Sequence, residues 1–542
     1  MEKEYIVVTV KGVDVAEIDS QLQRDTSGDG AVPNTIPGRT VDVVNARAYN
    51  NRMTHYNLTD EEAQTLSTDA RILSVCEKPL EETQELYATQ SGNFQRTTSD
   101  TQTSVNWGLW RHIQKALGEP DTSSTTFTQD YTYTLDGTGV DLVIQDDGVD
   151  PTGHPEWEDY AGNTRFNQVD WYQLTGMSGT MPANFYSTST GDSNRAGAHG
   201  SHCCGIAAGK TYGWAKNAQI YSMRIFGGTG YRIDTDRYDL IRLFHEQKPV
   251  DPNTGYKRPT VCNQSWGYSW YYRNSQFGSE PMTAVYFRGV DQSRASAQWT
   301  SADSQYGMVA SRHPMEYLPA DVEQEQLTDA GVICVKAAGN GYHPCAAQET
   351  GQYGSTRYNS YYTMGTTWAG YISSGNPIYY NRPSSPHSMD TVWVGNIDYT
   401  KFGTEEMLAE SSERGERLDI NAAGSEITSA TSTTSVYSGR QLHPDSSSHY
   451  IARISGTSMA APQVAGVACL YMQVNPGATA ADFKDFLNKT AKEYLYDTGG
   501  ADDYVYANST PRLYGGTKKV LYFPLNSPNK LKYGNNSGFD KG

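Results

Sequence analysis

The sequence lacks three features that would each indicate a particular class of protein. It has no excess of basic residues, because its formal net charge is −18, and nucleic-acid binding needs a basic face. It has no apolar run long enough to cross a bilayer. From Met1 it passes directly into a strand-like segment, without a secretory signal. We therefore expect neither nucleic acid nor a membrane as partner.

Cysteine is also scarce, with 7 residues in a chain of 542. An odd number does not suit a complete set of disulfides. Cys262, Cys334 and Cys469 lie inside apolar runs, where cysteine behaves as a small core residue. A disulfide framework is not expected, and a reducing compartment fits better.

The length exceeds that of one small domain, so we expect a core with appendages. Residues 5–78 form the first appendage, with four strand-like segments and two helical ones in the order βαββαβ. Thr59 and Glu62 have the spacing of a capping box at the start of the second helix. This order is typical of the ferredoxin-like α+β fold.

The rest of the chain divides by composition. Residues 79–105 are rich in Glu, Gln, Ser and Thr and predict a linker. From Gly139 onwards strands alternate with helices, which predicts an α/β fold with a parallel sheet flanked by helices. Buried strands are expected at 140–144, 219–226, 260–266 and 331–338. Segments of about 269–318 and 341–380 lack helical periodicity and predict insertions in surface loops. Residues 496–542 are expected to be a C-terminal extension, within which 519–523 favours a strand.

The most informative stretch is 455–466, where small residues surround Thr457 and Ser458 and continue as a helix to about Val474. Pro476 stops that helix, because proline lacks the N–H that helix continuation needs. A serine in the first turn of a buried helix lies near unpaired N–H groups and the positive end of the helix dipole. A nucleophile that attacks a carbonyl needs such a place for the developing oxyanion. Gly-Thr-Ser alone is a common loop tripeptide, so this interpretation requires partners.

Three other sequence motifs contain residues that could act together with Ser458. Asp146 follows the strand 140–144, and the carboxyl edge of a parallel sheet is where such folds bind ligands. His199 and His202 lie in the small-residue segment 198–209 and lack the spacing and the intervening Glu of a zinc-protease helix. Asn340 follows the strand 331–338.

Taken in the order Asp, His, Asn and Ser, these phrases resemble the motifs of the subtilisin-like serine proteases, or subtilases. The resemblance implies a catalytic domain over 106–495. It extends to the N-terminus, where residues 1–78 resemble an inhibitory prodomain. The alternative for residues 1–78 is an unrelated ferredoxin-like module. Residues 198–220 resemble the proteinase K branch in particular. Asp147 stands where Thr or Ser is more usual, a variation also found in the kexin-like branch, and Ser201 replaces a Thr.

The resemblance implies a serine endopeptidase that forms an acyl-enzyme on Ser458. His199 would be the general base, Asp146 would orient it, and the amide of Asn340 would donate to the oxyanion. His202 would be a packing residue. Cys203, one helical turn after His199, would lie beneath the imidazole.

An extended peptide is expected to dock as an added strand between small-residue segments. The substrate-binding residues implied by the resemblance are Gly228, Gly230, Ser265, Trp266, Gly267, Ala338 and Gly339. Expected partners are therefore a peptide or protein substrate and the protein's own prodomain, acting as an intramolecular inhibitor.

No cofactor is required by this chemistry, and no metal ligands are assigned. The chain lacks the longer loop that wraps a calcium ion in bacterial subtilisins, and Glu156 replaces the aspartate that ligates it. Structural calcium at other positions is compatible with the family, with ligands unknown.

The alternative is a structural or binding protein, for example a virion component, that keeps the subtilase scaffold without turnover. Retention of all four motif residues favours the enzyme. Similar subtilases without a signal sequence occur among bacteriophage proteins, where release by lysis or packaging in a particle makes secretion unnecessary. By this analogy the expected location is the cytoplasm or a virus particle.

Overall fold

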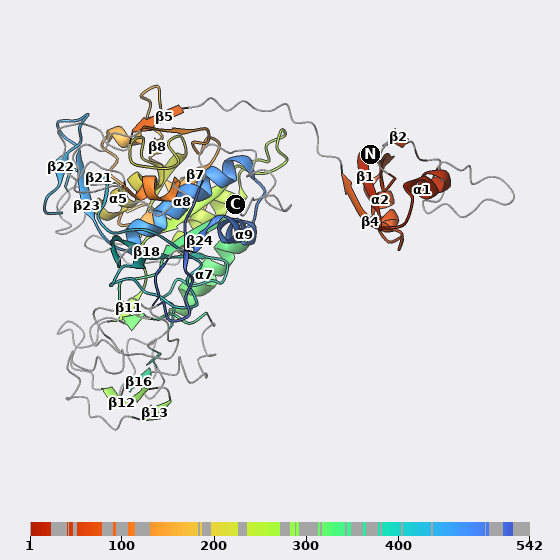
Figure 1. Ribbon diagram of the computed structural model, residues 1–542. Coiled ribbons are helices and arrows are strands. Elements are labelled where there is room, and N and C mark those ends of the chain that lie inside the picture. The colour runs from red at the N-terminus through yellow and green to blue at the C-terminus, as the bar shows by residue number, and fades with distance from the viewer. Residues whose placement is uncertain are drawn as a thin grey trace. The chain divides into compact units, whose positions relative to one another are not determined.

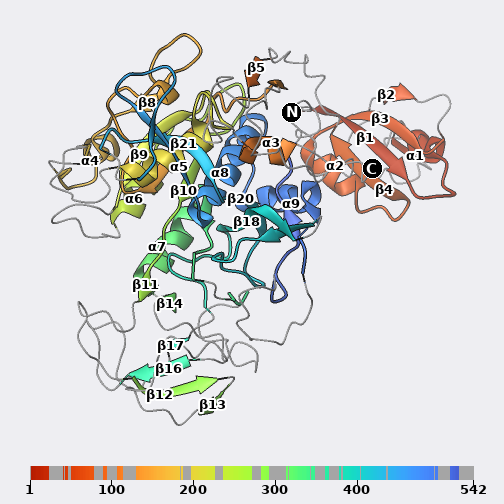
Figure 2. The ribbon, with the colours of Figure 1, turned by 60° about the vertical axis from the view of Figure 1, so that its left-hand side comes forward.

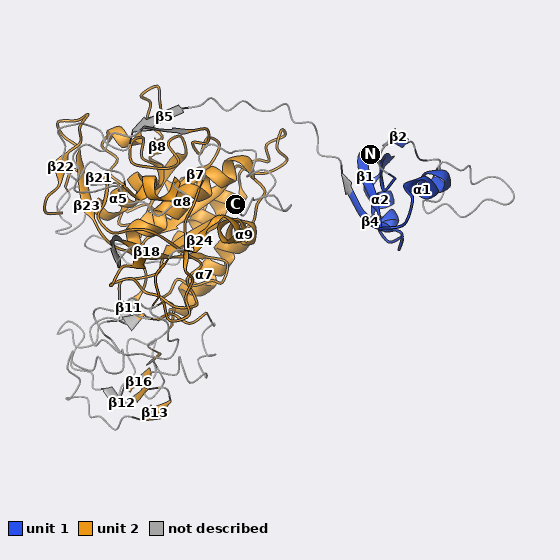
Figure 3. Cartoon of the chain, viewed as in Figure 1, with its two compact units in different colours: residues 1–87 blue, residues 88–542 orange. Residues whose placement is uncertain are grey.

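The chain forms two compact units, residues 1–87 and 88–542 (Figure 3). The computed structural model describes residues 2–22, 41, 43–46, 51–77, 90–93, 107–113, 130–182, 185–186, 197–225, 236–270, 282–287, 289–291, 313–314, 317–341, 344–347, 361–364, 378–379, 382–402, 405–434, 437–493, 495–497 and 513–523. None of the helices in these ranges is both long and apolar enough to span a membrane.

The first unit is an antiparallel sheet in the order β2-β3-β1-β4 with two helices (Figure 1). Its elements are β1 Lys3–Thr9, α1 Val15–Leu22, β2 Val43–Ala46, β3 Met53–Leu58, α2 Asp60–Leu66 and β4 Ile72–Glu77. The predicted βαββαβ order is confirmed. So is the capping box: Thr59 Oγ1 accepts from the N–H of Glu62 at 3.3 Å, and Glu62 Oε2 accepts from the N–H of Thr59 at 2.8 Å. Val7, Ile18 and Leu66 are fully buried in its own core.

The second unit is built on a sheet in the order β24-β25-β20-β18-β15-β10-β7-β9-β8. Neighbouring strands in this order run parallel except β24 at one edge, and β19 (Glu405–Leu408) pairs antiparallel with β18 outside this order. The strands are β7 Asp141–Asp146, β8 Phe166–Asn167, β9 Gln219–Arg224, β10 Thr260–Gln264, β15 Ile333–Ala337, β18 Val392–Phe402, β20 Ile420–Ala423, β24 Lys492–Glu493 and β25 Lys519–Val520. The four strands predicted from apolar runs are β7, β9, β10 and β15. The expected α/β fold is thus confirmed.

Helices cover both faces of this sheet (Figures 1 and 2). α6 (Asp236–Glu246) and α7 (Leu318–Asp329) pack against one face of the sheet, in a core that includes Val143, Cys262 and Cys334. α5 (Ala198–Ala208) and α8 (Thr457–Val474) pack with the opposite face. Strands covered on both sides need apolar residues in both directions, which explains their continuous apolar runs.

A smaller antiparallel sheet leads into α8. It has the order β21-β23-β22, with β21 Ile427–Thr431, β22 Gln441–Leu442 and β23 Tyr450–Ile454. β21 packs against α5, and Ser429 Oγ donates to the carbonyl of His202 at 2.8 Å. This sheet therefore joins the helix that carries His199 to the chain that enters Ser458.

Two regions differ from the domain organisation predicted from composition. Within the predicted linker 79–105, β5 (Gln90–Asn93) pairs antiparallel with β6 (Asp130–Tyr133) of the second unit. Within the predicted C-terminal extension 496–542, β25 joins the main sheet beside β20. Leu513, Leu521 and Phe523 are buried in the same unit. The expected strand near 519–523 is confirmed as β25, and its partners lie far away in sequence, beyond the reach of local patterns.

The two predicted insertions, about 269–318 and 341–380, contribute to one shared sheet. Its order is β13-β12-β16-β17, all antiparallel. The first insertion supplies β12 (Met282–Phe287) and β13 (Val290–Asp291), and the second supplies β16 (Tyr361–Met364) and β17 (Ile378–Tyr379). β11 (Ser269–Trp270) pairs with β14 (His313–Pro314) near the two ends of the first insertion. The insertions are thus paired with each other, which neither segment indicates alone.

Candidate active site

Asp146 and His199 meet at the carboxyl end of β7. Asp146 is the last residue of that strand and is fully buried, and His199 is the second residue of α5. His199 Nδ1 lies 2.8 Å from Asp146 Oδ1, which leaves Nε2 as the ring nitrogen available to a substrate. Burial alone would lower the pKa of His199, but Asp146 and, to a smaller extent, Cys203 together outweigh it and hold the pKa well above its usual 6.5. The pair has the arrangement of a general base and its orienting acid.

Ser458 lies in the first turn of α8, after Gly456, whose φ of 154° belongs to the region that favours glycine. Its hydroxyl donates to the carbonyl of Ser265 at 3.1 Å, and the hydroxyl of Ser265 donates back to the carbonyl of Ser458 at 2.8 Å. Within the described residues, the hydroxyl of Ser458 bonds to Ser265 and not to the imidazole of His199. The hydroxyl must therefore turn from Ser265 towards His199 before a proton can pass, and such bonds are often formed only when substrate is bound.

Asn340 lies directly beyond β15 and is fixed from the side of α8. Its Oδ1 accepts from the N–H of Thr457 at 2.9 Å and from the hydroxyl of Thr457 at 3.0 Å. The N–H of Gly339 donates to the same hydroxyl oxygen at 3.1 Å. Because both bonds to Asn340 need an acceptor, they assign its oxygen to this side and turn the amide nitrogen the other way. That nitrogen and the N–H of Ser458, in the first turn of α8, are two hydrogen-bond donors of the kind that an oxyanion hole requires.

The sequence model of the subtilase family matches residues 137–516, well over half of the chain. The chain belongs to the subtilase family.

Known relatives of this subtilase are distant. A cuticle-degrading serine protease of Arthrobotrys oligospora is 23% identical over 398 residues, which is 73% of this chain and 65% of that protein. The subtilisin-like protease PopC of Myxococcus xanthus is 26% identical over 357 residues, 66% of this chain and 56% of that protein. The chain thus spans less than two thirds of the length of these relatives. A solved cold-adapted subtilisin-like serine proteinase is 20% identical, with a TM-score of 0.42, and the likeness covers 77% of this chain and 97% of that one.

The subtilase places two of the expected substrate-binding segments side by side. Ser265, Trp266 and Gly267 follow β10, and Ala338 and Gly339 follow β15, the parallel neighbour of β10. The carboxyl ends of adjacent parallel strands meet at one edge of the sheet, so these segments flank the site of Ser458. Gly228 and Gly230 lie outside the described residues, and their role stays a prediction.

Two charged side chains, Lys336 and Glu413, contact these two segments from within the protein. The sequence alone did not predict these contacts. Lys336 is fully buried, and its ammonium donates to the carbonyl of Trp266 at 2.7 Å. Burial lowers the pKa of Lys336 to about 7. A Cβ placed on Gly339 would lie 2.4 Å from a carboxylate oxygen of Glu413. In the sequence, the one indication of these buried charges is Lys336, which stands inside the apolar run 333–338.

Cys203 and His202 take the places expected for them. Cys203 Sγ lies 4.0 Å from His199 Nδ1 and donates to the carbonyl of Ser458 at 3.3 Å. Burial raises the pKa of the Cys203 thiol, so it is not poised as a thiolate. His202 is buried and lies 3.0 Å from the carbonyl of Ala452, and burial lowers its pKa to about 3. The cysteines whose side chains the structure describes are free and buried: Cys203, Cys204, Cys262, Cys334, Cys345 and Cys469.

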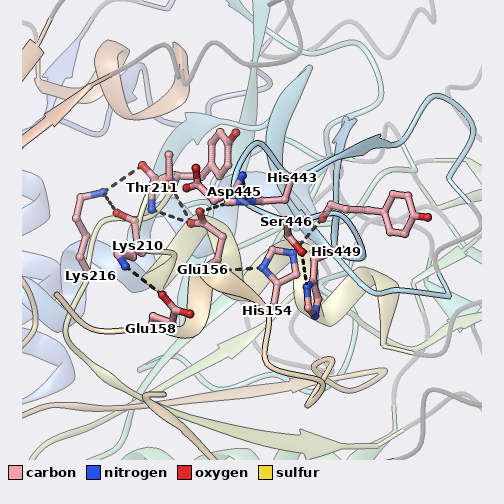
Figure 4. A network of polar contacts seen from close by, with 12 residues as sticks. His154, Glu156, Glu158, Lys210, Thr211, Lys216, His443, Asp445, Ser446 and His449 are labelled. Carbon is pink, nitrogen blue, oxygen red and sulfur yellow. Dashed lines mark hydrogen bonds and ion pairs between the residues drawn. The ribbon is translucent and has the colours of Figure 1, made fainter. Parts of the chain in front are cut away.

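Glu156, which replaces a calcium-binding aspartate of bacterial subtilisins, is engaged by protein groups alone (Figure 4). Its carboxylate is fully buried and accepts from the N–H groups of Thr211 at 2.8 Å and Tyr212 at 3.2 Å. His443 Nε2 lies 2.9 Å from its other oxygen. Nδ1 of His443 accepts from the N–H of Asp445 at 3.1 Å, so Nε2 carries the proton and can donate to Glu156. The hydrogen bonds of Glu156 and His443 are therefore satisfied without a metal.

In the neighbouring loop 210–216, the charged ammonium of Lys216 is surrounded by backbone carbonyls. The ammonium of Lys216 donates to the carbonyls of Lys210 and Thr211 at 3.2 Å (Figure 4). It also donates to the carbonyl of Gly213 at 2.7 Å. Lys216 is 3% exposed. A converging set of backbone carbonyls is the kind of site that otherwise binds Ca²⁺. In the part of the chain that the structure describes, the one compact cluster of possible metal ligands is Asp146, His199 and Cys203, which is the active site itself.

Proposed function

We propose that this subtilase is a serine endopeptidase that cleaves peptide bonds through an acyl-enzyme on Ser458. The observation that carries the proposal is the fixed geometry of Asn340, whose amide nitrogen is turned away from Thr457 beside the first turn of α8. A scaffold without turnover has no need to orient this amide. The 2.8 Å contact between His199 and Asp146 supports the same interpretation.

In this mechanism the extended substrate lies between the segments that follow β10 and β15. His199 Nε2 takes the proton of Ser458 as its oxygen attacks the scissile carbonyl, and Asp146 stabilises the imidazolium that forms. Asn340 and the N–H of Ser458 donate to the oxyanion. The imidazolium gives its proton to the leaving amine, and a water activated by the same base then releases the acyl group.

The test is steady-state hydrolysis of a mixed peptide library by the wild type and by Ser458→Ala. The wild type should cleave internal peptide bonds, and the variant should keep only a residual activity of about 10³–10⁴ over water. Equal activity in both proteins would contradict the assignment. A binding or structural protein on this scaffold predicts no hydrolysis by either, and the cleavage sites would also define the specificity.

We propose further that residues 1–78 act as an inhibitory prodomain. The first unit has a core of its own, as an independently folding inhibitor requires. Its last strand, β4, is followed by the segment that an active protease would cut. N-terminal sequencing of the wild type should give a new start between about Lys78 and Gln102, whereas Ser458→Ala should keep its original start. If both remain full length while the wild type hydrolyses peptides, the prodomain proposal is wrong.

A further inference from the structure

The helix that carries His199 lacks a cap from its own sequence. The residue at its N-cap position is Gly197, in a left-handed conformation with φ 69°, which offers no side chain to the first N–H groups. Buried N–H groups at a helix start need an acceptor from elsewhere. They find it in Asp147: Gly200 N–H donates to Asp147 Oδ1 at 2.7 Å, and His199 N–H to Oδ2 at 3.3 Å.

The loop that carries Asp147 is clamped against this first turn. A Cβ on Gly200 would lie 2.1 Å from the carbonyl oxygen of Gly148, so only glycine permits the close approach. The hydroxyl of Ser201 accepts from the N–H of Asp150 at 2.8 Å, which fastens the loop a second time. Asp147 thus cannot move without moving the backbone of His199.

The surroundings make the charge of Asp147 costly and sensitive to pH. Asp147 is 1% exposed. Burial raises its pKa to about 7, and the charge of Asp146 acts in the same direction while His199 opposes it. Two other ionisable groups lie near this loop. Arg224 is opposite Asp146 in β9 and packs against Gly148, and Tyr437 interacts with the charge of Asp147. Asp147 therefore changes its charge near neutral pH beside the base.

We propose that Asp147 is a second carboxylate of the active site, a positioning residue that holds the backbone of His199 while Asp146 holds its ring. Its negative charge adds to the field that stabilises the imidazolium of the transition state. When Asp147 is protonated the base becomes weaker and the cap loses its charge-assisted bonds. This inference rests on the proposed function, because it assigns a role to Asp147 in the same reaction.

The proposal predicts that two protons, not one, are taken up as activity is lost on acidification. In the wild type, log kcat/KM should rise with a limiting slope of about 2 below neutral pH, because His199 and Asp147 titrate together. In Asp147→Asn the slope should be about 1. The midpoint of this limb should move to lower pH by about 0.5–1 unit, because the imidazolium has lost an anionic neighbour. At pH 8, kcat/KM should fall by about 10²-fold or more with little change in KM, because a slope of 2 requires that the enzyme with a neutral side chain at position 147 is nearly inactive.

The measurement is kcat/KM for one peptide substrate between pH 5 and pH 9, with recovery at pH 8 checked after each acidic incubation. Asp147→Ser is the second variant, since it restores a neutral acceptor at the cap and should also give a slope of about 1. Asp150→Asn is the matched control: it removes a buried carboxylate of the same loop, which accepts from Thr152 and Thr433, and should keep the slope of the wild type.

The results separate the two proposals. A wild type that hydrolyses nothing overturns the proposed function itself. An active wild type with a slope of about 1, or an Asp147→Asn profile that matches the wild type in slope and midpoint, overturns the role of Asp147 and leaves the triad intact. A merely structural role predicts lower thermal stability in Asp147→Asn and Asp150→Asn alike, with unchanged profiles.

Discussion

Asn340 presents its carbonyl oxygen to Thr457, at 2.9 Å from the backbone nitrogen and 3.0 Å from the hydroxyl oxygen of that residue. Thr457 immediately precedes the proposed nucleophile, so a single residue both orients the proposed oxyanion donor and starts the helix of Ser458. The side chain of Thr457 is fully buried, which keeps water from competing for these bonds.

Replacement of Asn340 should therefore impair turnover more than binding. We expect Asn340→Ala to lower kcat by about 10²–10³-fold with little change in KM, because the oxyanion exists only in the transition state. Thr457→Val, which keeps the N–H bond and loses the hydroxyl bond, should have a smaller effect in the same direction. Thr457→Ser is the control and should approach the wild type. An unchanged kcat in Asn340→Ala would remove this residue from the mechanism.

Cys203 offers a chemical test of the same geometry. With Sγ at 4.0 Å from His199 Nδ1, a small mercurial bound to Cys203 should displace the imidazole. A shift of about 1 Å can cost on the order of 10²-fold in rate. Cys203→Ala should be active and resistant, and Cys204→Ala should stay sensitive, because its side chain lies on another face of α5. A folded but inactive Cys203→Ala would instead indicate a cysteine nucleophile and contradict the role of Ser458.

The Lys216 site should be important for stability rather than for catalysis. Lys216→Met removes the donor to three backbone carbonyls, of which that of Gly213 is buried, and we expect a loss of on the order of 3 kcal/mol in the free energy of unfolding. Lys210→Met is the matched control, because Lys210 pairs with Glu158 at the surface and both side chains are more than one third exposed. Such a pair contributes about 0–1 kcal/mol. Guanidinium unfolding of both variants measures the difference, and equal midpoints would contradict the structural role of Lys216.

Acid should destabilise the fold through histidines that are buried in the neutral state. Burial lowers the pKa of His112 and His202 to about 3 and of His154 and His245 to about 4. The unfolded chain binds these protons near pH 6.5, so their contribution to stability is complete above that pH and is lost as the pH falls towards 4. Urea unfolding of Ser458→Ala, which prevents self-digestion, should give a midpoint that falls between pH 7 and pH 5. A constant midpoint would show that these rings are not neutral in the folded state.

Local patterns predicted those parts of the structure that depend on neighbours in sequence. The capping box of Thr59 and Glu62 and the apolar strands β7, β9, β10 and β15 follow from propensity and burial, and the helix ending before Pro476 follows from the missing proline N–H. The positions of Asp146, His199, Asn340 and Ser458 at element ends came from motifs whose spacing the fold dictates.

The features that sequence did not reveal are contacts between distant segments. β5 pairs with β6, the two insertions share one sheet, and β25 completes the main sheet, but none of these strands has a pattern that names its partner. The role of Asp147 is similar. The sequence shows that Asp147 stands where Thr or Ser is more usual. Its two bonds to the backbone of α5 become apparent only when the loop and the helix are placed in three dimensions.

The most direct test of the account is labelling with a fluorophosphonate, followed by intact mass and peptide mapping. Such reagents react with a serine only when a base and an oxyanion hole activate it. The account predicts one label per wild-type chain, on the peptide that contains Ser458, with none on Ser458→Ala and strongly reduced labelling of His199→Ala. A wild type that remains unlabelled, or a label on another residue, would contradict the central claim that Ser458 is an activated nucleophile.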